Sequence, residues 1–248
     1  MTTARATRPA ALSLVALAVA LLVGAGGCMN HVVYREKGVE ALNRNDPAGA
    51  QVYLRSAVEK KPTDWRSQYL LGLSLLKSGR AAEAQIPLEQ ALQLKPQGEE
   101  APEVIDALAE SLFQQKRYEP LANFLAEVAG YYNTPRDFMR QGRYLEKTGD
   151  PDGAIVAYGK AGLFAPPTDP EPYIAMADLY DALGDVPKAV QALKWAYHAD
   201  PYNANLPDRF RRHGLVPGPT MAEAPPKAEQ PKRGLVPFKL PTLDAPWG

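Results

Sequence analysis

The sequence predicts an all-α solenoid, a row of helix–turn–helix units that lie against one another. Three observations lead to this prediction. The middle of the chain is rich in alanine and nearly lacks the alternation of Val, Ile and Thr that β-strands favour. Glycine, alanine and proline recur along it at a fixed offset. Hydrophobic residues make up 46% of the 248 residues, which is enough to bury a core along such a row.

The first 28 residues have the three parts of an export signal. Two arginines precede a short apolar run, "AALSLVALAVALLVG", and small residues follow it as far as Cys28. The run is shorter than the roughly 20 residues that a helix needs to span a bilayer. We therefore expect residues 1–28 to act as a signal peptide that exports the rest of the chain across an inner membrane.

The small residues before Cys28 resemble a bacterial lipobox, although Ala25 stands where leucine is usual. The resemblance implies that the thiol of Cys28 carries a diacylglycerol, because two or more acyl chains anchor a protein stably where one does not. Met29 follows the cysteine, which by resemblance to enterobacterial sorting permits delivery to an outer membrane, with the protein facing the periplasm. An uncleaved N-terminal anchor and ordinary secretion with a spare thiol are the alternatives.

A pattern of small residues and prolines repeats along the body of the chain. One set recurs after 34 residues: Gly38, Ala50, Ala57 and Pro62 match Gly72, Ala84, Ala91 and Pro96. A second set recurs after 35: Gly142, Ala154, Ala161 and Pro166 match Ala177, Ala189, Ala196 and Pro201. Several coincidences at one offset indicate a structural repeat of that length.

The pattern resembles the tetratricopeptide repeat (TPR), a helix–turn–helix unit of 34 residues. The segment from Leu71-Gly72 through Ala84, Leu88 and Ala91 to Pro96 matches it closely. The resemblance implies a right-handed α-solenoid with units at about 31–64, 65–98, 102–134, 135–168 and 170–203. The third unit departs from the pattern, with larger residues in place of two alanines and asparagine in place of the proline: Leu121, Val128 and Asn133.

Small residues at these positions have a physical role. The side chain at a helix crossing sets how closely two backbones approach, so glycine or alanine allows a separation near the short end of the 8–10 Å range. Gly72 costs about 1 kcal/mol of helix propensity relative to alanine, which closer packing must offset. Leu71, Leu75 and Leu88 are expected to fill the space around the crossing. No unit buries its apolar face alone, so each is stable only when it stacks on a neighbour.

Two further segments follow the repeats. Residues 204–214, "ANLPDRFRRHG", predict a polar capping helix for the last exposed face of the solenoid. Residues 215–248 are dominated by Pro, Ala, Lys and Glu, a composition that predicts a disordered tail. The tail is either passive or a short extended peptide that docks on a partner or on the protein's own groove.

The sequence contains little that could support catalysis. The three histidines, His31, His198 and His213, share no metal-ligand spacing, and Cys28 is the only cysteine. There is no nucleophile elbow, phosphate-binding glycine loop or zinc-protease motif. The formal net charge of zero gives no electrostatic drive toward nucleic acid. We therefore predict a protein that is not an enzyme and uses no cofactor or metal; an enzyme would need a site built from acids, Tyr and Arg alone.

The TPR resemblance also implies a binding surface, because the first helix of each unit lines the concave side of such arrays. Carried onto this chain, the partner-facing positions are Arg66, Tyr69, Leu73 and Lys77 in the second unit, Asp106, Glu110 and Phe113 in the third, Arg136, Met139 and Arg143 in the fourth, and Ile174, Asp178 and Asp181 in the fifth. This mixture of apolar and charged groups suits an extended or helical peptide. The clamp with which some family members bind chaperone tails is excluded, because its asparagine is missing: Val39 and Leu73 occupy that site in the first two units.

Together these features predict a lipid-anchored scaffold or assembly factor of a bacterial envelope that binds other proteins. It resembles the TPR lipoproteins that serve tight-adherence and type IV pilus assembly or secretin placement, although the fold hosts many roles. The alternative is an adaptor that presents substrates to a periplasmic protease or cell-wall hydrolase, since those family members also carry lipobox signals.

Overall fold

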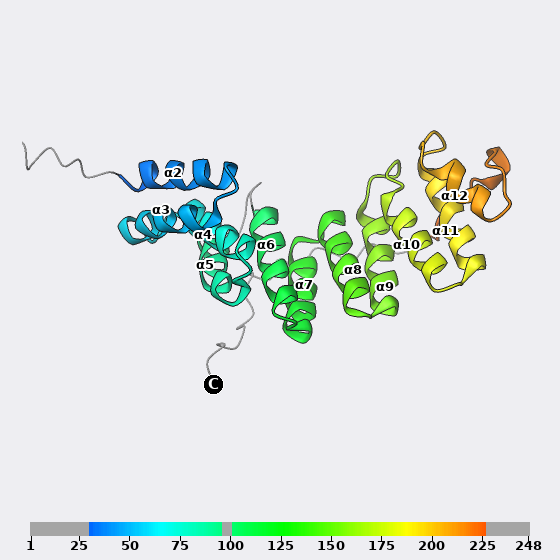
Figure 1. Cartoon of the computed structure of the whole chain (residues 1–248). Coiled ribbons are helices and arrows are strands. Elements are labelled where there is room, and N and C mark those ends of the chain that lie inside the picture. The colour runs from blue at the N-terminus through cyan, green and yellow to red at the C-terminus, as the bar shows by residue number, and fades with distance from the viewer. Residues whose placement is uncertain (1–29, 96–100, 227–248) are drawn as a thin grey trace, which may run out of the picture.

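The computed structural model describes residues 30–95 and 101–226, and within them the chain forms eleven α-helices and one short 3-10 helix. The helices are α2 (His31–Asn43), α3 (Pro47–Lys60), α4 (Trp65–Lys77), α5 (Ala81–Leu94), α6 (Ala101–Gln114), α7 (Tyr118–Tyr132), α8 (Pro135–Thr148), α9 (Pro151–Phe164), α10 (Glu171–Ala182), α11 (Val186–Ala199), α12 (Leu206–Arg212) and η1 (Pro219–Met221). Successive helices pack as pairs, and the pairs follow one another in a row from α2 to α11 (Figure 1). The predicted all-α solenoid is confirmed.

Small residues lie where the two helices of a pair cross. A Cβ atom added to Gly72 in α4 would lie 2.4 Å from Cγ of Leu88 in α5. At Gly142 in α8 the same atom would lie 2.4 Å from Cε1 of Tyr158 in α9. No carbon atom fits at such a distance, so glycine is what allows these large side chains to pack across the crossing.

The second helices of three pairs begin in the same way. The carboxylates of Asp46, Asp150 and Asp185 each accept a hydrogen bond from the backbone N–H three residues later, at 2.8, 2.9 and 3.2 Å. A proline stands in the first turn of each of these helices. Aspartate satisfies an amide that the helix leaves unpaired, and proline has no amide to leave unpaired, so the local sequence fixes where α3, α9 and α11 start.

The third pair, α6 and α7, shows how the chain accommodates its departures from the repeat. Leu121 and Val128 are both 1% exposed, so the larger side chains join the core. Asn133 ends α7 in the left-handed conformation, with φ of 50°, and its side-chain amide donates a hydrogen bond to the carbonyl oxygen of Gly130 at 2.9 Å. Asparagine tolerates this conformation better than most residues, so it stops the helix where a proline was expected.

The apolar core is divided near the start of the fourth pair. One cluster of buried residues runs from α2 to α7 and another from α9 to α12. A small third cluster, made of Ala129, Phe138 and Ala161, connects α7, α8 and α9. Arg140 in α8 is only 2% exposed at this division. Both polar and apolar contacts therefore join the two halves of the solenoid.

The C-terminal end of the solenoid is covered by α12. Leu206 and Phe210 are fully buried, and the ring of Phe210 packs edge-on against Tyr197 in α11. The other side of α12 carries charged residues, of which Asp208, Arg211 and Arg212 are exposed. The helix thus has one apolar face on the core and one polar face, as a cap requires.

The segment after α12 differs from our expectation of a disordered tail from residue 215. Leu215 and Met221 are partly buried against the cluster of α9 to α12, and residues 219–221 form η1. The ammonium group of Lys194 in α11 lies 3.4 Å from the carboxylate of Glu223. Two apolar side chains and an ion pair therefore hold residues 215–226 on α11. Residues 227–248 lie outside the described part of the chain.

The predicted signal peptide, including Cys28, also lies outside the described residues. Within residues 30–95 and 101–226 no helix combines the length and the apolar character that crossing a membrane requires.

Candidate functional site

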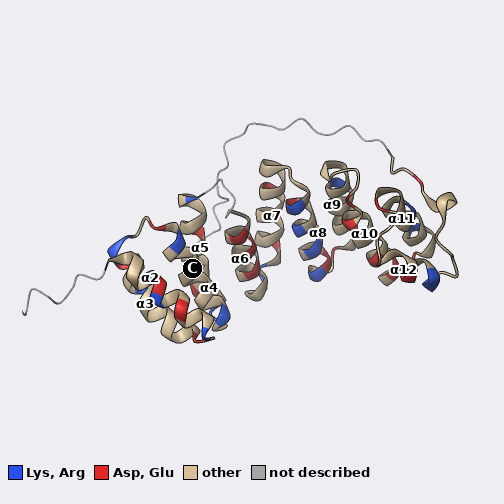
Figure 2. Ribbon diagram, turned by 90° about the horizontal axis from the view of Figure 1, so that it is seen from above, with Lys and Arg blue, Asp and Glu red and all other residues tan. Residues whose placement is uncertain are grey.

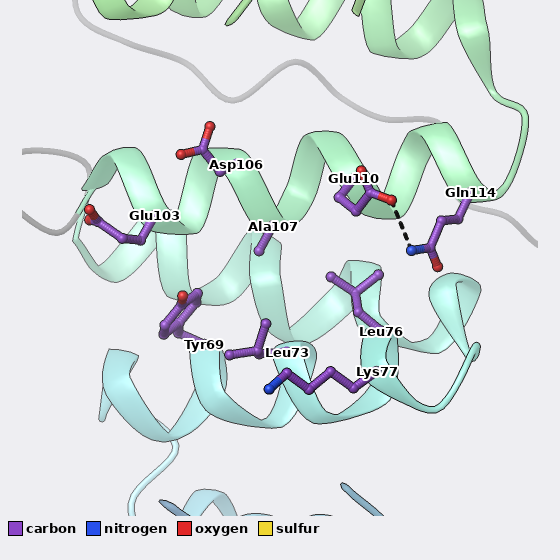
Figure 3. Close-up of a pocket in the computed structure, with 9 residues that line it drawn as sticks. All are labelled: Tyr69, Leu73, Leu76, Lys77, Glu103, Asp106, Ala107, Glu110 and Gln114. Atoms are coloured by element: carbon purple, nitrogen blue, oxygen red, sulfur yellow. Dashed lines mark hydrogen bonds between the residues drawn. The ribbon is translucent and has the colours of Figure 1, made fainter. Parts of the chain in front are cut away.

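A pocket of about 390 Å³ lies between α4 and α6, the first helices of the second and third pairs (Figure 3). Its lining residues are Tyr69, Leu73, Leu76 and Lys77 from α4, and Glu103, Asp106, Ala107, Glu110 and Gln114 from α6. We call this the α4–α6 pocket. It opens on the face formed by the first helix of each pair, which we call the first-helix face.

The repeat length explains which residues meet in the pocket. Tyr69 and Glu103 are 34 residues apart, as are Leu73 and Ala107. Residues one repeat apart occupy equivalent positions on neighbouring units, so stacking brings them side by side. The small side chain of Ala107 opposite Leu73 leaves the hollow open, with an apolar floor.

One side of the pocket is acidic. The acids of α6, Glu103, Asp106 and Glu110, are spaced three and four residues apart, which places them along one face of the helix. Burial and the neighbouring charges of Glu103 and Asp106 raise the pKa of the Tyr69 hydroxyl. The negative field of α6 therefore reaches the aromatic ring on the opposite wall.

Helix α8 contacts these acids from the other side. Arg136 lies 3.5 Å from the carboxylate of Glu103 and 3.1 Å from that of Asp106. The hydroxyl of Tyr144 donates a hydrogen bond to Glu110 at 3.0 Å. In Figure 3 the carboxylate of Asp106 points away from α4, consistent with these partners on α8. Glu103 and Asp106 nonetheless keep side chains that are 47% and 48% exposed.

Arg140 is the buried member of this network. It donates hydrogen bonds to the carboxylates of Asp106 and Asp137 and to the carbonyl oxygen of Pro102. Burial alone would lower the pKa of its guanidinium group, but the two carboxylates outweigh burial and raise it. Arg140 therefore stays charged and fixes α8 against α6.

Charge alternates from one first helix to the next (Figure 2). Helix α4 carries only cations, α6 only acids, α8 an excess of cations, α10 only acids and α12 an excess of cations. Ion pairs join α6 to α8 and α10 to α12. Within the described residues no ion pair joins Lys77 of α4 to the acids of α6, and this is where the pocket lies.

Five of the predicted partner-facing residues line the α4–α6 pocket: Tyr69, Leu73, Lys77, Asp106 and Glu110. Phe113 lies next to it, with its ring centroid 5.7 Å from that of Tyr144, so the aromatic surface continues onto α8.

Three other predicted positions are exposed but do not line the pocket. Arg136 extends across α6, as described above, and Arg143 is exposed on α8. The guanidinium of Arg66 lies 5.2 Å from the ring centroid of Trp65.

The predicted positions on α10 and one on α8 are buried or already paired within the chain. Ile174 is 5% exposed and belongs to the core, and Met139 is partly buried against two core clusters. The carboxylate of Asp178 accepts two hydrogen bonds from Arg209, at 2.7 and 2.9 Å, and Asp181 lies 3.1 Å from His213. The prediction was wrong for Ile174, which packs in the core, while Arg209 and His213 pair with Asp178 and Asp181.

Sequence reasoning missed five residues of the pocket and its network: Leu76, Glu103, Ala107, Gln114 and Arg140. The 34-residue offset could have found most of them, because Glu103, Ala107 and Arg140 lie one repeat from Tyr69, Leu73 and Asp106. Their roles were hidden because an acid or arginine on a helix is usually solvated.

Comparison with known proteins agrees with this architecture. The tetratricopeptide-repeat family matches residues 35–99. MamA (residues 41 to the end) from Desulfovibrio magneticus RS-1 is 18% identical over 71% of this chain and 97% of its own, with a TM-score of 0.54. YrrB, described as a TPR protein with an unusual peptide-binding site, is 16% identical over 75% of this chain and 93% of its own, with a TM-score of 0.50. No curated protein matches the sequence significantly. At these identities the similarity concerns the fold.

Proposed function

We propose that this chain is a tetratricopeptide-repeat protein that acts as a non-enzymatic scaffold of the bacterial cell envelope and binds a partner peptide or helix on its first-helix face. The α4–α6 pocket carries this proposal. It combines an apolar floor, formed by Leu73 and Ala107, with charged groups of both signs at its rim. An apolar anchor would bind the floor, and the charges would select its flanking residues.

The surface beside the pocket extends the proposed binding site. Phe113 and Tyr144 pack edge to face, and the ammonium group of Lys147 lies 5.6 Å and 5.0 Å from their ring centroids. Half-buried aromatic rings with a cation over them provide contact area without requiring long side chains to become ordered. A partner that spans both features would contact α4, α6 and α8. Peptide binding by YrrB, which has a similar fold, supports this mode.

We further propose that Cys28 is lipidated and that the protein faces the periplasm, where it takes part in pilus or secretion-system assembly. The lipobox-like residues before Cys28 support the anchor. Replacing Cys28 by serine should move the protein from the membrane to the soluble fraction at low salt. If the Cys28→Ser variant still sediments with membranes, the proposed anchor is wrong, whatever the groove binds.

A site-specific photo-crosslinker tests the groove directly. Placed at Leu73, it should capture a partner protein in living cells, because that side chain lines the pocket. Placed at Val52, which is 67% exposed on α3, it should not. Secretin or pilus components in the Leu73 product would support the assembly role, whereas a protease or cell-wall hydrolase would favour the adaptor role. Equal capture at both positions would contradict binding in the groove.

A further inference from the structure

The α4–α6 pocket is negatively charged on one side, and this charge indicates what kind of segment would bind there. Glu103 and Glu110 are at its rim, and one cation, Lys77, faces them from α4. The contacts of these acids with α8, to Arg136 and Tyr144, come from outside the pocket and leave Glu103 half exposed. A segment that places a cation beside an apolar side chain would complement both the rim and the floor.

The chain itself contains such a segment beyond the described residues. Residues 231–240, "PKRGLVPFKL", carry three cations and no acid, and apolar residues stand between the cations. Two prolines restrict the backbone to extended conformations, which lowers the entropy lost when the segment binds. The composition is therefore the complement of the pocket in charge and in apolar character.

The segment is also long enough to reach the pocket. The described chain ends at Pro226, close to α11, where Glu223 pairs with Lys194. Thirteen residues lead from there to Lys239, an extended length of about 45 Å. Helix α11 is five helices from α6, a path of about 50 Å across the helices at 10 Å per packed pair. Because the helices alternate between two layers, the direct distance is shorter than this path.

We propose that residues 231–240 of this chain occupy the α4–α6 pocket, with Phe238 on the apolar floor and Lys239 beside Glu103 and Glu110. The tail then covers the groove until a partner displaces it. The docking of the tail in the pocket does not depend on the proposed function. Only the competition between the tail and a partner rests on that function.

Disulfide formation in the full chain tests this proposal. In a Cys28→Ser background, Gln114→Cys at the rim and Leu240→Cys in the tail, which leaves Phe238 and Lys239 in place, should form an intramolecular disulfide on mild oxidation. The control pairs Val52→Cys, on the outer surface of α3, with Leu240→Cys. Docking should make the rim pair react about tenfold faster than the control, because it raises the local concentration of the tail thiol.

Charge reversal in the tail provides the second arm. Lys232→Glu, Arg233→Glu and Lys239→Glu together should bring the rate of the rim pair down to that of the control, and the substitutions cannot unfold a solenoid they do not belong to. Equal rates for the two pairs, or a fast rate that survives charge reversal, would overturn the proposal, as would disulfides formed between two molecules. If the photo-crosslinker at Leu73 captures a partner while the two cysteine pairs react at equal rates, the proposed function stands and the docking of the tail is rejected.

Discussion

Arg140 and Asp106 form an ion pair across two neighbouring units, although 34 residues separate them in the chain. The guanidinium group also binds Asp137 on its own helix, and the side chains of Arg140 and Asp137 are only 2% and 5% exposed. This pair lies where the apolar core is divided. The orientation of α8 against α6, and with it the acidic wall of the pocket, therefore depends on a buried charge.

Replacing Arg140 by methionine should reduce the free energy of unfolding by about 3–5 kcal/mol, because it leaves the buried carboxylate of Asp137 without its cation. Arg136→Met is the control, since Arg136 binds the same row of acids but is 49% exposed; its loss should stay below about 1 kcal/mol. Urea unfolding of both variants measures the difference. Equal losses would show that burial of Arg140 has no energetic consequence.

Gly142→Ala should destabilise the protein by about 1–3 kcal/mol, because the new methyl group would overlap the ring of Tyr158. Gly159, within α9, has no atom within 4 Å of an added Cβ. Gly159→Ala should therefore stabilise by up to about 1 kcal/mol through helix propensity. Opposite signs in thermal or urea unfolding support the close helix crossing, and a stabilising Gly142→Ala would refute it.

Asp64 should contribute a pH-dependent stabilisation. Burial raises the pKa of its carboxyl group, but hydrogen bonds from Ser67 and Arg35, at 2.5 and 2.9 Å, outweigh burial and leave the pKa below its usual value. The contribution is thus complete above the unfolded-state pKa of about 3.9 and is lost as the pH falls through the lower folded-state value. The stability difference between the wild type and Asp64→Asn should be constant from neutral pH to about pH 5 and shrink at more acidic pH. A difference that does not depend on pH would contradict this assignment.

A chain that ends at Gly214 should melt a few degrees below one that ends at Pro226, because it loses the contacts of Leu215 and Met221 with the core of α9 to α12. Partial burial of two such side chains contributes about 1–2 kcal/mol, and each kcal/mol shifts the Tm of a domain of this size by about 2–4 °C. Calorimetry of the two chains gives the comparison. Identical melting temperatures would mean that residues 215–226 add nothing to stability.

Much of the fold was predictable because it is repetitive and local. Gly72 and Leu88 stand at fixed positions of one unit, and the structure brings them into contact as that pattern predicts. Five of the nine residues that line the pocket followed from the same resemblance: Tyr69, Leu73, Lys77, Asp106 and Glu110. Ile174 was misplaced and Arg140 missed because exposure depends on how one unit leans on the next, which a pattern within a unit does not contain.

By itself, the sequence determined the repeat length, the order of the helices and the residues at each crossing, because these follow from contacts between residues close together in the chain. Only the tertiary structure decided which charges are buried, which are open and where the hollow lies. Such properties depend on how neighbouring units pack, and this packing decides whether an arginine is solvated or is the buried partner of two carboxylates, as Arg140 is.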